Sequence, residues 1–155
     1  MTATISACGT YRYRLERVWD ADRAKVAFIM LNPSTADAEN DDATIRRCIG
    51  FAKSWGFGGL IVGNLFALRS KNPKRLYEHA DPIGPDNNAH LLTIALRSEQ
   101  IVCAWGAHGR HRDRGRDVVR LLKGCNLSAL KITKGGQPGH PLYVAGDTQP
   151  REYRI

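Results

Sequence analysis

A run of apolar residues that ends abruptly on Asn-Pro constrains the fold of this chain more than any other feature. Phe28-Ile-Met-Leu31 has the composition of a strand buried on both faces, and Asn32-Pro33 follows it directly. Proline lacks a ladder donor and restricts the residue before it, so the strand must end at a turn. Open α/β sheets bind ligands at the carboxyl ends of their central strands. Residues 31–35 therefore predict either a ligand-binding turn or a plain connection between strand and helix.

Strand patterns alternate with helix patterns along the rest of the chain, which predicts a mainly parallel sheet with helices on both faces. We expect buried strands at residues 25–31, 60–66, 101–105 and 127–133. We expect helices after a cap at Asp41 or Asp42, at residues 86–97 and at residues 113–123. On the second helix, Leu92, Ala95 and Leu96 should face inward. The prediction is a single α/β domain over residues 1–155 with four core strands.

An alternating segment precedes the first buried strand. Residues 11–17 alternate apolar with charged side chains, and Asp20-Ala-Asp-Arg23 has the composition of a turn. We therefore expect residues 11–17 to form a hairpin with residues 25–31 and to add an antiparallel edge to the sheet.

Charge and cysteine content restrict the partners and the compartment. A formal charge of +8 over 155 residues favours anionic partners, nucleic acid or nucleotides first. Cations gather at residues 69–75 and 108–116, which are either phosphate-binding loops or solvated faces. The four cysteines have no metal or disulfide spacing, and Cys48 and Cys103 should be buried free thiols. With no membrane-spanning pattern, we expect a cytoplasmic protein with no membrane partner.

Polar residues follow the predicted core strands. Asn32 and Asn64 close the first two strands, Trp105 with a glycine turn closes the third, and His140 follows the last. Parallel strands end at one edge of a sheet, so these side chains should line one polar pocket. Each also has a structural explanation: a turn former for Asn32, a backbone partner for Asn64 and a turn residue for His140.

The motifs at these strand ends resemble two families. Leu-Asn-Pro-Ser, Asn-Leu-Phe, Ala-Trp-Gly and His-Pro-Leu-Tyr, beginning at residues 31, 64, 104 and 140, are similar to motifs of short bacterial and phage proteins of unknown function. More distantly, the same segments resemble the four strand-end motifs of the uracil-DNA glycosylase superfamily. That resemblance implies a uracil-DNA-glycosylase-like three-layer sandwich with a four-stranded parallel sheet.

The resemblance to the glycosylases also implies roles for individual residues. Asn32 would orient a water molecule and stabilise positive charge that develops on the sugar. Asn64 would bind the edge of a pyrimidine, and His140 would donate to the carbonyl oxygen of the departing base. Neither a cofactor nor a metal is implied. The expected function is nucleobase binding, with metal-independent hydrolysis of an N-glycosidic bond if catalysis is retained.

Departures from the glycosylase pattern widen the range of ligands. Ser34 stands where the family has a tyrosine that excludes the thymine methyl group, so a larger 5-substituted pyrimidine is expected to fit. Phe66 or Trp105 would have to replace the family's stacking aromatic. Only 15 residues follow His140, without a recognisable wedge, so single-stranded nucleic acid or a free nucleotide is as credible a ligand as duplex DNA.

Other assignments remain open alongside the glycosylase hypothesis. Phosphates would be held without sequence readout by a set of arginines: Arg69, Arg110, Arg112, Arg114 and Arg116. One alternative function is a non-catalytic nucleotide or single-stranded nucleic-acid binding module. Another is a metal site formed by Asp37, Asp41 and Asp42, although caps and solvated loop residues explain these acids more simply.

Overall fold

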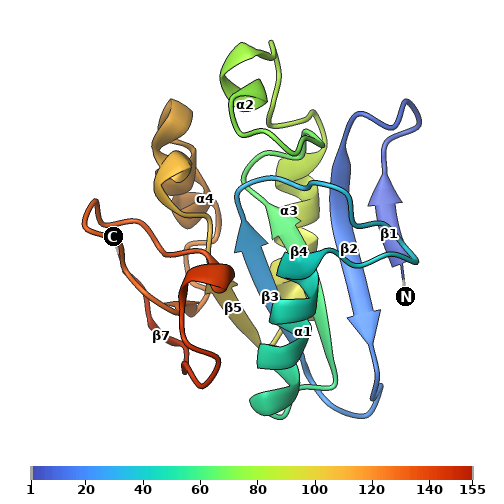
Figure 1. Ribbon diagram of the computed structural model, residues 1–155, viewed down its shortest axis with the longest axis vertical. Coiled ribbons are helices and arrows are strands. Elements are labelled where there is room, and N and C mark those ends of the chain that lie inside the picture. Colours follow the sequence, from blue (N-terminus) through green and yellow to red (C-terminus); the bar gives the residue numbers. More distant parts are fainter. Residues whose placement is uncertain (1, 155) are drawn as a thin grey trace.

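The computed structural model describes residues 2–154 as an α/β structure built on one mixed sheet (Figure 1). Seven strands of the described residues lie in the order β1-β2-β4-β3-β5-β6-β7. These strands are β1 (Thr2–Ile5), β2 (Arg12–Val18), β3 (Lys25–Met30), β4 (Gly59–Asn64), β5 (Gln100–Cys103), β6 (Leu127–Ala129) and β7 (Arg151–Glu152). The helices are α1 (Ala43–Ser54), α2 (Arg75–Glu78), α3 (Asn87–Arg97) and α4 (Arg114–Leu121), with 3-10 turns η1 (Ala107–Asp113) and η2 (Pro141–Tyr143).

Parallel pairing holds the centre of the sheet together. β3 pairs in parallel with β4 on one side and with β5 on the other, and β5 pairs in parallel with β6. The residues of β3 from Val26 to Met30 are all buried, as expected for a strand covered on both faces. The predicted core strands are therefore confirmed, although β6 is shorter than predicted.

The predicted hairpin between residues 11–17 and 25–31 is wrong. β2 is antiparallel, but its partners are β1 and β4, so β4 lies between β2 and β3. The connection from β2 to β3 passes the start of β4, where a Cβ on Gly58 would lie 2.0 Å from the carbonyl oxygen of Asp20. β3 is apolar from Val26 to Met30 and takes parallel neighbours on both sides, which leaves β2 to pair with β4.

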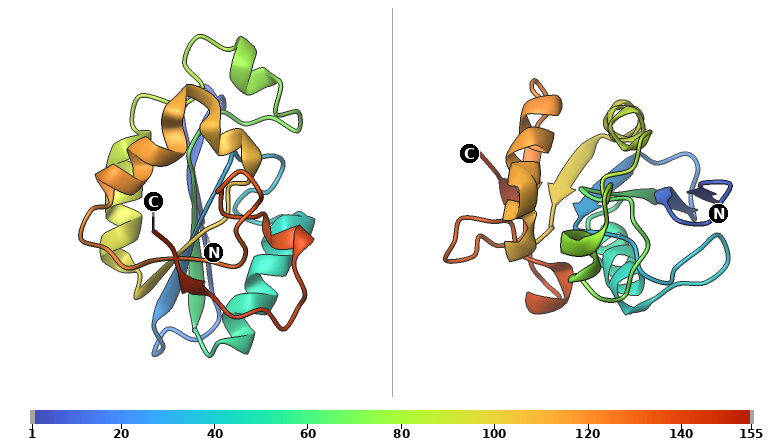
Figure 2. Two further views of the ribbon diagram at one scale, coloured as in Figure 1. Left: turned by 90° about the vertical axis from the view of Figure 1, so that its left-hand side faces the viewer. Right: turned by 90° about the horizontal axis from the view of Figure 1, so that it is seen from above.

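Helices cover both faces of the sheet (Figure 2). On one face, α1 packs Ile45, Cys48 and Phe51 against β3 and β4. Its N-cap is Asp42, one of the two caps that the sequence allowed, and the Asp42 side chain accepts a hydrogen bond from the Ile45 N–H. On the other face, α3 and α4 contribute a second cluster that includes Leu91, Ile94 and Val118. Cys48 and Cys103 are buried free thiols, as predicted.

The inward face of α3 differs from the prediction. Leu91 and Ile94 are buried, whereas Leu96 is 89% exposed and Leu92 is 43% exposed. The helix lies close to β4, since a Cβ on Gly63 would lie 2.6 Å from Ile94 Cδ1. Apolar periodicity allowed two neighbouring faces of α3, and this close approach at Gly63 selects the one that carries Ile94. No helix within residues 2–154 has the length and apolar composition needed to cross a membrane.

Candidate functional site

A cavity of about 480 Å³ lies at the carboxyl ends of β3 and β4. This edge is at the top of Figure 1, where the segment that contains α2 stands above it. Several of the predicted site residues line the cavity together: Asn32, Ser34, Asn64, Trp105 and His140. The geometry of parallel strands therefore brings together the strand-end residues that the sequence singled out.

Asn64 ends β4 opposite Met30 of β3, and its side chain is buried with no hydrogen-bond partner. The residue is 1% exposed, and neither Oδ1 nor Nδ2 bonds to any other residue of 2–154. The backbone oxygen of Asn64 accepts a hydrogen bond from the side-chain amide of Asn87 at 2.9 Å. Buried amides are nearly always paired, because an unpaired one costs about 1–3 kcal/mol. An amide left unpaired in a cavity wall has donors and an acceptor available for a ligand.

Asn32 is held by its nitrogen. Nδ2 donates to the carbonyl oxygens of Pro33, Leu68 and Ser70 at 3.2, 3.2 and 3.0 Å. These bonds fix the amide orientation and leave Oδ1 as the atom that can accept a hydrogen bond from water or a ligand. Asn32 is thus both the turn former and a polar wall of the cavity.

His140 is oriented by the turn that it begins. Its Nδ1 accepts the backbone N–H of Leu142 at 3.2 Å, which places the proton of the neutral ring on Nε2. Burial lowers the pKa of His140, and the negative charge of Asp42 offsets part of that shift. A neutral imidazole with a free Nε2–H is therefore available as a donor. Arg47 of α1 holds this turn by donating from Nε to the Pro141 oxygen at 3.3 Å and from Nη2 to the Val144 oxygen.

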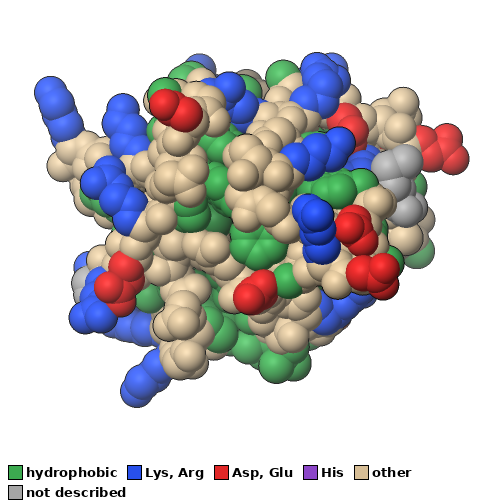
Figure 3. All heavy atoms as spheres, turned by 90° about the horizontal axis from the view of Figure 1, so that it is seen from below, with side chains coloured by type: hydrophobic (Ala, Val, Ile, Leu, Met, Phe, Trp, Pro, Cys, Tyr) green, Lys and Arg blue, Asp and Glu red, His purple; other side chains and the backbone are tan. Residues whose placement is uncertain are grey.

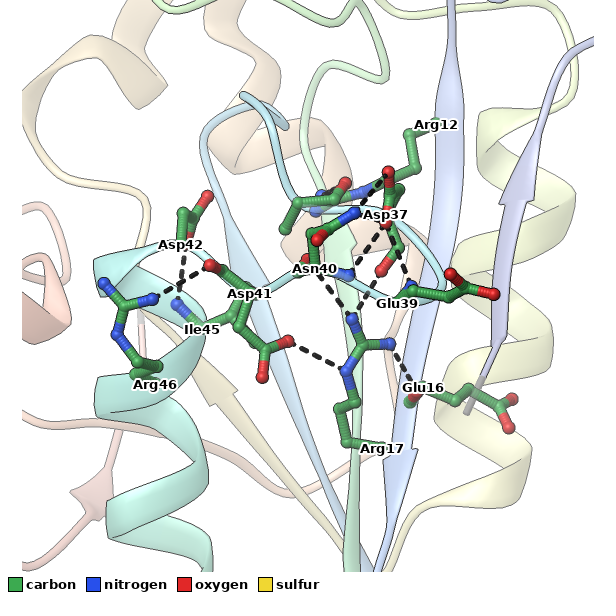
Figure 4. A network of polar contacts seen from close by, with 11 residues as sticks. Arg12, Glu16, Arg17, Asp37, Glu39, Asn40, Asp41, Asp42, Ile45 and Arg46 are labelled. Carbon is green, nitrogen blue, oxygen red and sulfur yellow. Dashed lines mark hydrogen bonds and ion pairs between the residues drawn. The ribbon is translucent and has the colours of Figure 1, made fainter.

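Ser34 and Asp42 lie side by side at the cavity wall. The Ser34 hydroxyl donates to Asp42 Oδ2 at 2.9 Å, while Asp42 Oδ1 caps α1. The loop before α1 is tied by similar local bonds (Figure 4). Asp37 accepts from the backbone of Glu39 and Asn40. No group of three or more His, Cys, Asp or Glu within residues 2–154 could hold a metal ion, so the three acids do not converge as the metal hypothesis required.

The aromatic residues near the cavity differ in burial and in whether they line it. Trp105 lines the cavity but is 2% exposed, and its Nε1 donates to Gln137 Oε1 at 2.9 Å. Phe66 is fully buried and does not line the cavity; its ring contacts His111 instead. Tyr143 lines the cavity, is 77% exposed, and lies 5.4 Å from the His140 ring. In the sequence, Tyr143 was noted only as part of the His-Pro-Leu-Tyr motif. Its exposure makes it the aromatic residue best placed to cover a ligand.

The predicted phosphate-binding arginines fall into two groups. Arg110, Arg112 and Arg116 are exposed and Arg69 is half-buried. Arg114 is different because it is buried, with Nε donating to the Leu65 oxygen and Nη2 to Asn88 Oδ1. A guanidinium used in this way supports the fold, so Arg114 does not belong with the arginines available to phosphates.

A larger hollow of about 810 Å³ lies at the opposite end of the sheet and is lined by residues that include Trp55, Phe57 and Leu127. Figure 3 shows the underside of the molecule, where acidic and basic side chains alternate around apolar surface. None of the unpaired buried side-chain atoms of residues 2–154 belongs to the lining of this hollow. Of the two hollows, only the cavity at the carboxyl edge is lined by residues with unpaired buried side-chain atoms in the described part of the chain.

Comparison with known proteins decides the family. The model of a family described as "Protein of unknown function (DUF1643)" matches residues 12–142. The chain belongs to this family. The resemblance to a family of unknown function is thus confirmed, and the matched range of this DUF1643 protein includes every residue of the cavity named above except Tyr143.

Curated relatives are more distant and much longer. Chromodomain-helicase-DNA-binding protein 1-like from Danio rerio is 26% identical over 112 residues, which are 72% of this chain and 11% of that protein. Its counterpart from Mus musculus is 22% identical over 116 residues, 75% of this chain and 12% of that protein. The chain thus spans about one ninth of the length of these relatives. No solved structure matches the chain significantly, and the likeness to uracil-DNA glycosylases stays a prediction.

Proposed function

We propose that this DUF1643 protein binds a nucleobase in the cavity at the carboxyl edge and hydrolyses its N-glycosidic bond. The unpaired amide of Asn64 carries this proposal, because an amide offers an acceptor beside donors in one plane. The edge of a pyrimidine offers the complementary set. The adjacent parallel strands β4, β3 and β5, which lie between helices and end at the cavity, also agree with a glycosylase-like fold.

The walls of the cavity supply groups for both halves of the reaction. Asn32 Oδ1 accepts from a water molecule and orients it toward C1′ of the sugar. As the bond from C1′ to the base nitrogen breaks, the electron pair leaves with the base, and the Nε2–H of His140 stabilises the resulting negative charge on a carbonyl oxygen. The water oxygen bonds to C1′, its proton passes to solvent, and the base takes a proton from solvent. Tyr143 covers the base from the open side.

The partner is a nucleotide or a nucleic-acid strand. Exposed cations of the segments beside the cavity, among them Lys71, Arg110 and Arg112, would hold phosphates through charge alone. The curated relatives are named as DNA-binding proteins, which is in line with this partner.

A second candidate is a binding module without chemistry. Asp42 is the one carboxylate among the described residues that line the cavity. Both of its oxygens already accept hydrogen bonds, from Ser34 and from the Ile45 backbone, so it does not serve as a ready base. The neutral amide Asn32 would then position ligand rather than activate water.

Base release from defined substrates separates the two functions. Purified protein is incubated with single-stranded oligonucleotides and nucleosides that carry uracil or 5-hydroxymethyluracil, and free base is measured by chromatography. We expect release, a loss on the order of 100-fold in His140→Gln, and binding retained in that variant. The exposed Lys123→Gln is the matched control. Binding without release in the unmodified protein would support the binding module. The absence of both binding and release would refute the proposal.

A further inference from the structure

Arg12 of β2 lines the cavity as a buried cation without a counter-ion. The residue is 2% exposed, and its Nη1 donates to the Ala36 oxygen at 2.8 Å. That is the one hydrogen bond of its side chain within residues 2–154, and Nε is buried with no partner at all. Arg12 forms no ion pair with any carboxylate of the described residues.

Arg17, on the same strand and equally buried at 2% exposure, shows how this loop satisfies an arginine that serves the fold. Its Nε forms an ion pair with Asp41 at 2.9 Å, and its other nitrogens donate to the backbone oxygens of Glu16, Asp37 and Asn40 (Figure 4). The two guanidinium groups thus differ in pairing and not in burial. Arg12 has donors left over at the cavity wall, and Arg17 does not line the cavity.

No nearby acid of residues 2–154 forms an ion pair with Arg12, and each already binds other groups. Asp41 pairs with Arg17, Asp42 accepts from Ser34 and caps α1, and Asp37 accepts from Glu39 and Asn40. Burial lowers the pKa of Arg12 to about 10, while the negative charge of Asp42 opposes the shift. The guanidinium therefore stays charged at neutral pH, and a buried charge without a partner is costly.

Building on the proposed function, we infer that the ligand carries an anionic group that reaches Arg12 inside the cavity. Exposed arginines and lysines at the rim can hold the phosphates of a strand, but Arg12 meets only a group that enters with the base. A planar guanidinium with free N–H groups matches the paired oxygens of a carboxylate or a phosphate. Two sources share this chemistry: a carboxylate on the pyrimidine ring, and the phosphate of a free nucleotide.

Binding of matched probes to the unmodified protein tests this inference. The dissociation constants of uridine, 5-carboxyuridine, uridine 5′-monophosphate and ribose 5-phosphate are measured by calorimetry at constant ionic strength. We expect 5-carboxyuridine, uridine 5′-monophosphate or both to bind at least tenfold more tightly than uridine, which corresponds to about 1.4 kcal/mol of binding free energy. Tighter binding of 5-carboxyuridine would place the anionic group on the base, and tighter binding of uridine 5′-monophosphate would place it on the sugar.

Variants then assign the effect to Arg12. In Arg12→Gln the preference for the anionic probe should disappear, Arg12→Lys should keep part of it, and the control Lys123→Gln should keep all of it. Equal affinity for uridine and both anionic nucleosides in the unmodified protein overturns the inference and leaves nucleobase binding standing, even if the variants fail to fold. If ribose 5-phosphate binds in an Arg12-dependent way and neither uridine nor 5-carboxyuridine binds, the anion site is supported and nucleobase binding is refuted. Binding of none of the probes refutes both.

Discussion

The Nδ1 atom of His140 accepts the backbone N–H of Leu142 at 3.2 Å, so protonation of this ring would break the bond that orients it. Burial lowers the pKa of His140 from its usual 6.5. In acid below that value the unfolded chain binds more protons at this residue than the folded protein does. The stability that His140 contributes is therefore complete above pH 6.5 and is lost as the pH falls below it.

The affinity for ligand should depend on pH in the same direction as stability. We expect affinity to be constant above pH 6.5 and to fall in more acidic solution, with a midpoint below that value. Nitrogen NMR of the imidazole should show the Nε2–H tautomer at neutral pH and report the midpoint directly. Equal affinity at pH 7 and pH 5, with His140 titrating between them, would contradict this role.

Asn64 and Asn87 are neighbouring buried amides with opposite expected effects. Asn87 Nδ2 donates to the backbone oxygens of Asn64 and Leu65, so Asn87→Ala should lower the free energy of unfolding by about 2 kcal/mol. Asn64→Ala removes an amide without a partner and should lower that free energy by less than about 1 kcal/mol. Urea unfolding measures both.

The same two variants should differ in the reverse sense in binding. Asn64→Ala should lose ligand affinity on the order of tenfold or more, since a site built to hydrogen-bond its ligand loses that partner. A large loss of stability in Asn64→Ala together with unchanged affinity would show that its amide belongs to the fold.

Arg114 and Arg116 are two residues apart but should act differently. Arg116→Gln should reduce the slope of nucleic-acid affinity against salt by about 1, because Arg116 is exposed and its ion pair with exposed Asp113 is long, at 3.9 Å, and can give way to a phosphate. Arg114→Ala should instead lower the free energy of unfolding by about 2 kcal/mol or more, because it removes the donor to Asn88 Oδ1 and one of the two side-chain donors to the Leu65 oxygen. Filter binding at several salt concentrations, with thermal unfolding, checks both outcomes; a salt slope unchanged in Arg116→Gln would remove it from the interface.

The orientation of α3 can be tested without a ligand. Leu96 is 89% exposed, so Leu96→Glu should change the free energy of unfolding by less than about 0.5 kcal/mol. Leu91 is fully buried, and Leu91→Ala should cost about 2–5 kcal/mol. Similar losses of unfolding free energy in Leu96→Glu and Leu91→Ala would instead support the inward face of α3 that the sequence predicted, with Leu96 buried.

Much of the candidate site followed from the sequence because one geometric rule governs it. Strands that run in parallel end at one edge, so Asn32, Asn64 and His140 were expected together, and they line one cavity. Local patterns also predicted the strand at residues 25–31 and narrowed the helix cap to Asp41 or Asp42, of which the structure has Asp42.

What the sequence missed depends on contacts between distant segments. The insertion of β4 between β2 and β3 is a choice of partner across more than 40 residues of chain, which alternation in β2 does not encode. β1 and β7 were not predicted, since such short edge strands carry little pattern. The burial of Arg12 and Arg114 was invisible for the same reason: a basic residue appears equally polar in the sequence whether it meets solvent or a carbonyl oxygen.

A crystal structure of the protein soaked with uridine and 5-carboxyuridine tests the central claim most directly. We expect a pyrimidine in the cavity, with its polar edge about 2.7–3.2 Å from the Asn64 amide and His140 Nε2 beside a carbonyl oxygen of the base. An empty cavity at saturating ligand, or an Asn64 amide bonded to the protein's own side chains, would contradict the claim.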